Sequence, residues 1–177
     1  MSQGGKIKPT LFILSTILVV ALGWTWWRSE GVPQGLSFEL KDASGRTHTA
    51  QELRGQHTLV HFWASWCASC LDEIPALWAM AAQFEGTPLH VLALSLDDTW
   101  ADANAVLEKY PPGKNVTVLL DPKQQTPAVY GSYQFPETYW IGPDLKVVTK
   151  WVGPQPWDSS EFQVGLRKLL KDDGTSR

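Results

Sequence analysis

Cysteine is scarce in this chain, and its scarcity limits the kinds of site that the chain can build. The 177 residues include two cysteines, Cys67 and Cys70. A structural zinc site needs four ligands, usually two such pairs or one pair with two spaced histidines. His57 and His61 have a suitable spacing, but they lie in or just before a predicted strand, where they need not converge. We therefore predict that the chain holds no metal.

Excess charge, low-complexity runs and internal repeats are also missing. The formal net charge is −3 and 19% of the residues are charged, so the chain lacks the basic face that nucleic-acid binding requires. No flavin or nicotinamide motif is present. We therefore expect no cofactor and no nucleic-acid partner, and a body of about 140 residues is large enough for one globular core.

Charge is absent from one long apolar run, residues 11–27. Its length is within the range of a membrane-spanning helix. Lysines precede it and three tryptophans lie at its far end, which favours an uncleaved anchor over a cleaved signal peptide. We expect a bacterial inner-membrane protein whose folded part faces the periplasm, arranged as a cytoplasmic N-terminus 1–10, an anchor 11–27, a linker 28–36, a folded domain 37–171 and a tail 172–177.

Apolar runs of strand length alternate with helical segments through the rest of the chain. Strands are expected at 58–63, 89–96 and 115–121, with helices at 77–84, 97–110 and 126–132. Asp residues should cap the second of these helices and Thr126 the third. A hairpin within 37–50, another within 137–153 and a helix over 158–171 complete the pattern. The prediction is an α/β fold with a mixed sheet and helices on both faces.

Besides metal binding, two roles are possible for the cysteine pair: a structural staple and a redox-active pair. As a structural staple it would close so short a loop that the chain-entropy gain is about 2 kcal/mol, against roughly 3 kcal/mol for a fifteen-residue loop. As a redox pair, it would lie where a helix begins after a buried strand. A helix N-terminus favours an anion, so Cys67 would be stabilised as the attacking thiolate, with Cys70 one turn later to resolve a mixed disulfide. The spacing favours the redox use.

The stretch FWASWCASC resembles the active-site segment of the thioredoxin fold. Trp66, the two cysteines, Glu73 and Pro75 match the pattern W-C-x-x-C-x-x-E-x-P of the membrane-anchored TlpA-like thioredoxins, which include the ResA and CcmG/DsbE reductases of cytochrome c maturation. The resemblance covers about 37–171 and implies a central βα insertion, a redox-active Cys67–Cys70 disulfide and a cis-proline at Pro136.

Three residues of the predicted site, Glu73, His61 and Glu137, have two interpretations each. Glu73 is either an exposed acid of the first helical turns or a buried carboxylate that raises the thiol pKa and exchanges a proton with Cys70. His61 is either a core histidine, which we favour, or a proton acceptor beneath the cysteines. Trp66, Phe135, Pro136 and Pro75 are expected to shape the site and its substrate surface. Glu137 is either a solvated acid or a substrate contact.

The resemblance implies an enzyme, an anchored thiol:disulfide oxidoreductase. We expect Cys67 to attack disulfides of extracytoplasmic proteins, either apocytochrome c or metal-assembly factors, and a membrane-embedded thiol reductase to return the electrons. Two alternatives remain: an oxidant or isomerase using the same cysteines, and a copper-delivery or binding module. The wider cysteine spacing that copper delivery would want is absent, as is the P-x-x-x-T-x-x-C signature of peroxidases.

Overall fold

One mixed sheet of seven strands organises the computed structural model, which describes residues 35–172. The strands are β1 (Glu39–Lys41), β2 (Thr47–Thr49), β3 (His57–Trp63), β4 (Leu89–Ser95), β5 (Val116–Leu120), β6 (Glu137–Ile141) and β7 (Val147–Val152). Their order is β2-β1-β5-β4-β3-β6-β7. The central strands β3, β4 and β5 are parallel, and all other neighbours are antiparallel.

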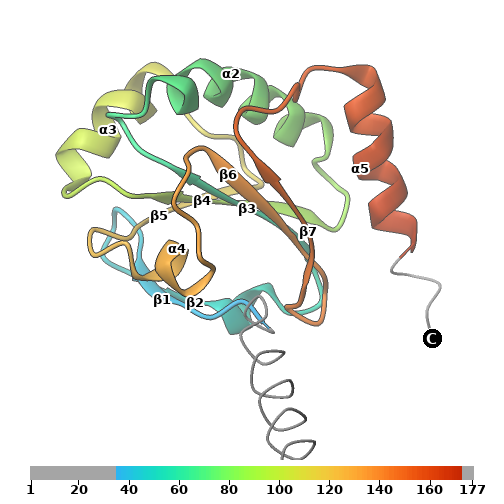
Figure 1. The fold of residues 1–177 in the computed structure, drawn as a ribbon, viewed down its shortest axis with the longest axis horizontal. Coiled ribbons are helices and arrows are strands. Elements are labelled where there is room, and N and C mark those ends of the chain that lie inside the picture. The colour runs from blue at the N-terminus through green and yellow to red at the C-terminus, as the bar shows by residue number, and fades with distance from the viewer. Residues whose placement is uncertain (1–34, 173–177) are drawn as a thin grey trace, which may run out of the picture. The chain divides into compact units, whose positions relative to one another are not determined.

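Helices cover both faces of this sheet, as the sequence predicts (Figure 1). They are α2 (Ala68–Gln83), α3 (Trp100–Lys109), α4 (Gln125–Val129) and α5 (Ser160–Asp172), with a 3-10 turn at Ala50–Leu53. In Figure 1, α2 and α3 lie on one side of the sheet, α4 lies on the other, and α5 lies beside β7. The fold is thioredoxin-like, with the expected N-terminal hairpin β1–β2 and the α3–β5 insertion.

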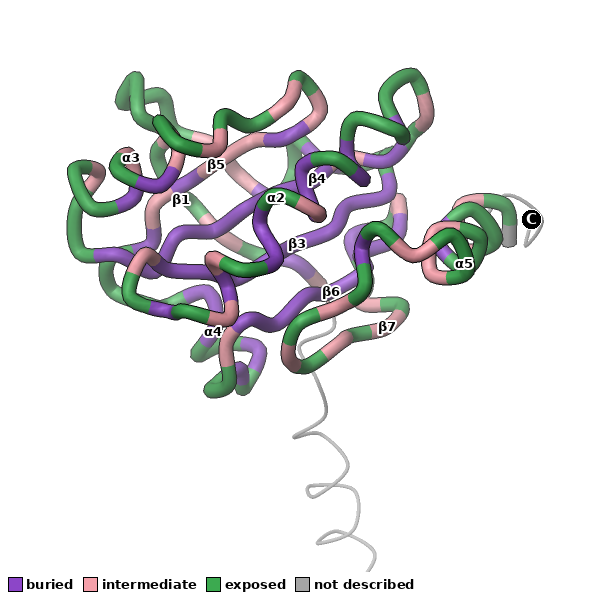
Figure 2. The backbone as a smooth tube through the Cα atoms, turned by 90° about the horizontal axis from the view of Figure 1, so that it is seen from above, coloured by how far each residue is buried: buried purple, intermediate pink, exposed green. Residues whose placement is uncertain are grey.

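The strands at the centre of the sheet are largely buried, because helices cover both of its faces (Figure 2). Every residue of β3 and β6 is buried. Three fully buried tryptophans, Trp63, Trp140 and Trp157, are the largest side chains of the core. These three tryptophans therefore serve packing first.

Strand β3 determines which side chains reach the cysteine helix. His61 pairs with Ala93 of β4 and Thr138 of β6 in the sheet register. Successive side chains of a strand point to opposite faces, so His61 lies on the α2 face and Phe62 on the α4 face. Contacts agree: the imidazole of His61 approaches Glu73 of α2, whereas the Phe62 ring packs on Tyr139.

Two predicted helix caps are wrong. Helix α3 is capped by Thr99, whose hydroxyl oxygen accepts from the backbone N–H of Asp102, because the preceding Asp97 is buried in other hydrogen bonds. Thr126 lies inside α4 rather than at its cap, and the carboxylate of Asp121 accepts from the backbone N–H of Thr126 instead. In both cases a side chain a few residues away forms the bond that the predicted cap would have made.

The predicted N-terminal segments 1–10 and 11–27 lie outside the described residues, as do most of the linker and of the tail. Between residues 35 and 172, no helix has both the length and the apolar composition that crossing a bilayer requires. The expected anchor therefore stays a prediction.

Candidate active site

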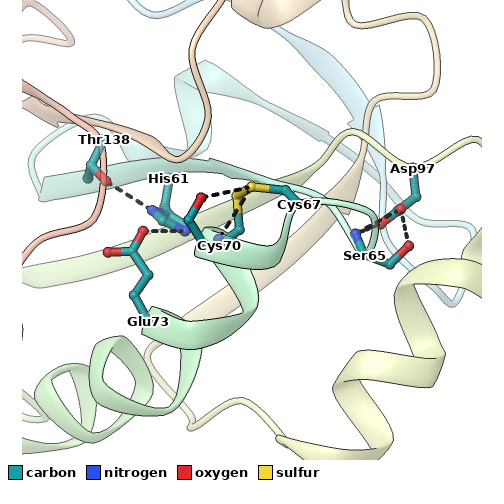
Figure 3. The surroundings of a disulfide bond; sticks show 8 residues. His61, Ser65, Cys67, Cys70, Glu73, Asp97 and Thr138 are labelled. Atoms are coloured by element: carbon teal, nitrogen blue, oxygen red, sulfur yellow. Dashed lines mark hydrogen bonds and ion pairs between the residues drawn. A yellow bond between two sulfur atoms is a disulfide. The ribbon is translucent and has the colours of Figure 1, made fainter.

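The two cysteines lie where β3 passes into α2. Cys67 is the N-cap of α2, and its sulfur accepts a hydrogen bond from the backbone N–H of Cys70 at 3.3 Å. A disulfide joins the pair, with Cα atoms 5.3 Å apart. Figure 3 shows the disulfide between the two cysteines at the start of α2. Cys67 is 8% exposed, whereas Cys70 is fully buried. Of the two cysteines, only Cys67 therefore retains some solvent exposure, and a partner molecule would meet it first.

A buried carboxylate, Asp97, holds the loop that precedes the cysteines. Its oxygens accept from the backbone N–H of Ser65 at 2.9 Å and from the Ser65 hydroxyl at 2.6 Å. The hydroxyl of Ser95, at the end of β4, donates to the same carboxylate at 2.8 Å. The turn carrying Trp66 and Cys67 is thus fixed to the end of the neighbouring parallel strand.

Glu73 lies one helical turn beyond Cys70 and is buried, as the functional interpretation of this residue requires. Its Oε2 accepts two hydrogen bonds, from Nε1 of Trp157 at 2.6 Å and from the backbone N–H of Gln155 at 2.9 Å. Burial raises the pKa of the Glu73 carboxyl above its ordinary value, and these two hydrogen bonds offset part of that effect. A carboxyl group with a raised pKa is suited to exchange a proton with a neighbouring thiol.

His61 is fully buried beneath α2 and is neutral. Its Nδ1 is hydrogen-bonded to Oγ1 of Thr138 at 2.9 Å, and its Nε2 lies 3.9 Å from Oε1 of Glu73. Burial lowers the pKa of His61 to about 3. His61 is therefore uncharged at ordinary pH and does not act as a cation beside the cysteines.

Aromatic side chains border the disulfide. Trp66 is 60% exposed, and its ring makes an edge contact with the half-buried Phe135, with centroids 6.4 Å apart. The Phe135–Pro136 peptide bond is cis. The carbonyl of Pro136 accepts from the backbone N–H of Gly153, so this oxygen is not available to a substrate. Trp66 and Phe135 together present apolar surface to a partner.

Glu137, directly after the cis bond, is buried rather than solvated, which corrects one of its two interpretations. It forms an ion pair with Nζ of Lys150, which also donates to the hydroxyl oxygen of Tyr139 at 3.2 Å. The hydrogen bond to Glu137 raises the pKa of Lys150. This pair lies on the α4 face of the sheet, opposite His61, because Glu137 and Thr138 are adjacent in one strand.

The remaining predicted residue, Pro75, lies inside α2, two positions beyond Glu73. Within residues 35–172, no group of three or more His, Cys, Asp or Glu side chains is arranged to hold a metal ion. The carboxyl group of Glu73 and the imidazole of His61, which face each other near the disulfide, are groups that can carry protons.

Sequence reasoning missed three residues of this site. Asp97 carried a local signal, since it directly follows a predicted strand that is parallel to β3, and the carboxyl ends of parallel strands meet at one edge. Trp157 and Thr138 carried none, because they are distant in the chain from Glu73 and His61, which they contact.

Comparisons with known proteins agree with this geometry. A family model described as the AhpC/TSA family matches residues 33–150. The thiol-disulfide oxidoreductase ResA of Bacillus subtilis strain 168 is 29% identical over 154 residues, which cover 81% of this chain and 85% of ResA. The thiol:disulfide interchange protein DsbE of Allochromatium vinosum is 36% identical over 117 residues, covering 66% of this chain and 61% of DsbE.

Solved structures are similar over most of the described domain. A crystal structure assigned as the thiol:disulfide interchange protein DsbE of Chlorobium tepidum matches with a TM-score of 0.69 and 29% identity, covering 79% of this chain and 99% of that one. MTB DsbF, solved in mixed oxidised and reduced forms, matches with a TM-score of 0.65 and 26% identity, covering 77% and 98%.

Proposed function

The chain belongs to the AhpC/TSA family and is a thiol-disulfide oxidoreductase of the ResA and DsbE type, and we propose that it reduces disulfides of proteins outside the cytoplasm. The observation that carries the proposal is the unequal exposure of the cysteines. Cys67, at the start of α2, keeps 8% of its surface exposed, whereas Cys70 has none exposed. This is the arrangement that a nucleophile and a resolving thiol need.

The reaction starts from the reduced pair. The helix N-terminus and the backbone N–H of Cys70 stabilise the Cys67 thiolate. The thiolate attacks a substrate disulfide, forming a mixed disulfide and releasing one substrate thiolate. Cys70 then gives its proton to Glu73 and attacks Cys67, which releases the second substrate thiolate and leaves the Cys67–Cys70 disulfide.

The reducing direction is supported by the short insertion in the fold. Disulfide oxidants of this fold usually carry a large helical insertion, whereas α3 has 10 residues and α4 has five. Ala68 and Ser69, between the cysteines, leave the reduction potential anywhere in the roughly −120 to −270 mV spread of such proteins. The direction therefore needs a direct measurement.

The partners that we propose are extracytoplasmic protein disulfides. Apocytochrome c cysteines and cysteines of copper-site assembly factors are the substrate classes, by similarity to the ResA and DsbE group. An N-terminal anchor over 11–27 would hold the enzyme in the bacterial inner membrane with its domain in the periplasm, next to a membrane-embedded thiol reductase as electron donor. The uncharged run 11–27 and the lysines before it support this placement.

Thiol trapping in cells tests the direction. Cells are quenched in acid and treated with a mass-tagged alkylating reagent, and the redox state of the Cys67–Cys70 pair is read from the gel shift. A mostly reduced pair supports the reductase. A mostly oxidised pair would instead identify an oxidant.

A trapping variant tests the partners. Cys70→Ala should accumulate a mixed disulfide between Cys67 and the substrate, which mass spectrometry identifies, while Cys67→Ala in the same cells serves as the matched control. A cytoplasmic protein as the main adduct would contradict the periplasmic placement.

A further inference from the structure

Two buried polar atoms face each other beside the cysteines and have no hydrogen-bond partner within residues 35–172. They are Nε2 of His61 and Oε1 of Glu73, 3.9 Å apart. Figure 3 shows the Glu73 carboxyl group directed toward the His61 ring. A buried polar atom without a partner is strongly disfavoured. A proton placed between these two atoms gives each of them a hydrogen-bond partner, once the two side chains move slightly closer together.

The other hydrogen bonds of the two residues determine where that proton lies. Oε2 of Glu73 already accepts from Trp157 and from the Gln155 backbone, so in the neutral acid the proton lies on Oε1. Nδ1 of His61 is bonded to Thr138. When Nδ1 carries the ring proton and donates to that hydroxyl oxygen, Nε2 is a free acceptor. The neutral forms of both residues, which burial favours, fit together in this way.

We propose that His61 is a positioning residue for proton transfer, whose Nε2 accepts a hydrogen bond from the protonated Oε1 of Glu73. This inference rests on the proposed function, in which Glu73 accepts the proton of Cys70. It adds His61 as the hydrogen-bond partner of Glu73. An ionised Glu73 takes a proton from Cys70, and His61 then holds that proton away from the sulfur. The imidazole acts through Glu73 and does not touch the reacting sulfur atoms.

The step balances in atoms and electrons. The S–H bond of Cys70 breaks, and its proton moves to Oε1 of Glu73. The electron pair left on the Cys70 sulfur forms the bond to Cys67, and the bond between Cys67 and the substrate sulfur breaks. The substrate leaves as a thiolate and takes a proton from solvent, while the Cys67–Cys70 pair is oxidised.

Among the described residues, the elements around the pair add no competing titratable group. Helix α2 presents the two cysteines, which do not titrate while they form the disulfide. Strand β6 and the segment before α5 present Thr138, Gln155 and Trp157, whose contacts are given above. The ion pair of the buried Glu137 with the exposed Lys150 lies on the opposite face of the sheet. The pH dependence of His61 should therefore follow Glu73.

Nuclear magnetic resonance of the oxidised full-length chain in detergent tests the geometry. With 15N-labelled histidine and 13C-labelled glutamate, we expect Nε2 of His61 to be unprotonated and its shift to titrate with the same midpoint as the Glu73 carboxyl carbon. In Glu73→Gln, whose amide can donate to Nε2, the ring should stay in the same tautomer without that titration. A proton on Nε2 in the wild type, or a titration that survives in Glu73→Gln, overturns the proposal.

Kinetics test the consequence. His61→Leu should slow the Cys70-dependent resolving step about tenfold, less than the roughly 10²–10⁴-fold effect of a direct acid–base group, and leave the attack by Cys67 unchanged. His61→Asn, whose amide oxygen is an acceptor, should keep the resolving rate within about threefold. Equal slowing of both steps by His61→Leu overturns the proposal.

Two further measurements keep these tests separate. If His61→Leu does not fold, the wild-type spectra still decide the proposal. Insulin reduction by the wild type tests the proposed reductase activity. Its outcome does not depend on which role His61 has.

Discussion

Trp157 donates a hydrogen bond from its indole Nε1 to Oε2 of Glu73 at 2.6 Å, although 84 residues separate the two. Glu73 belongs to the helix that carries the cysteines, and Trp157 lies in the segment that leads into α5. The bond fixes one carboxylate oxygen and leaves the other facing His61. The C-terminal segment therefore helps to build the site.

Trp157→Phe removes this donor while keeping an aromatic ring in the core. We expect unfolding in urea, followed by circular dichroism at pH 7, to show a loss of about 1–3 kcal/mol, because a buried acceptor loses a partner. Trp151→Phe is the matched control, since Trp151 also packs on Phe162 but is not bonded to Glu73. Equal losses in the two variants would contradict the role of the bond.

Glu73→Gln should change how stability depends on pH. Because the pKa of Glu73 is raised in the folded state, the folded protein prefers the neutral acid. Its contribution is fully present below the ordinary value of 4.5 and is lost as the pH rises through the folded pKa. The amide introduced by Glu73→Gln cannot ionise, so the melting temperature of the variant should rise relative to that of the wild type as the pH increases above 4.5. A difference that is constant over this range would contradict the assignment.

His61 should destabilise the fold in acid. Its folded pKa of about 3 lies below the ordinary 6.5, so its stabilisation is present above pH 6.5 and is lost as the pH falls toward 3. Each pH unit in that window is equivalent to about 1.4 kcal/mol, which gives a loss on the order of a few kcal/mol. In His61→Asn, this contribution to the acid-induced loss of stability should be missing. Urea unfolding measured at a series of pH values checks this. The two proteins are compared first at about pH 8, where His61 is neutral in the folded and the unfolded chain alike.

Asp97→Ala should loosen the loop before the cysteines. The substitution leaves the backbone N–H and hydroxyl of Ser65, together with the hydroxyl of Ser95, without their acceptor. We expect a loss of about 2–4 kcal/mol in stability, because several buried or partly buried hydrogen bonds are lost, and we expect slower insulin reduction. Asp98→Ala is the control, because Asp98 is exposed next to it. An Asp97→Ala variant as stable as Asp98→Ala would rule out this anchoring.

Trp66→Ala should weaken substrate binding with little effect on folding. Its ring is 60% exposed, so we expect a stability change below about 1 kcal/mol. The KM for a protein disulfide should rise several-fold, while the reaction with a small disulfide is unchanged. Tyr133→Ala removes another exposed aromatic ring, 79% exposed, and serves as the comparison. Equal effects on large and small substrates would argue against a docking role for Trp66.

Local patterns were sufficient to predict most of the elements. The apolar run that ends at Trp63 became β3, and the cysteine spacing correctly indicated a helix that begins at the pair. The caps at Thr99 and Asp121 were not predicted, because several polar residues near each helix start could have made the same bond. Which of several nearby polar side chains caps a helix depends on how deeply each of them is buried. The spacing of residues in the sequence does not give that burial.

The chain order alone specified a strand, a turn and a helix that presents two cysteines one turn apart, since these features depend on residues close together in sequence. Tertiary packing shifted the pKa values of Glu73 and His61 and supplied their partners Trp157 and Thr138. The reason is physical: a pKa in a protein interior depends on the water that is excluded and on the dipoles nearby, and both come from segments far away in the chain.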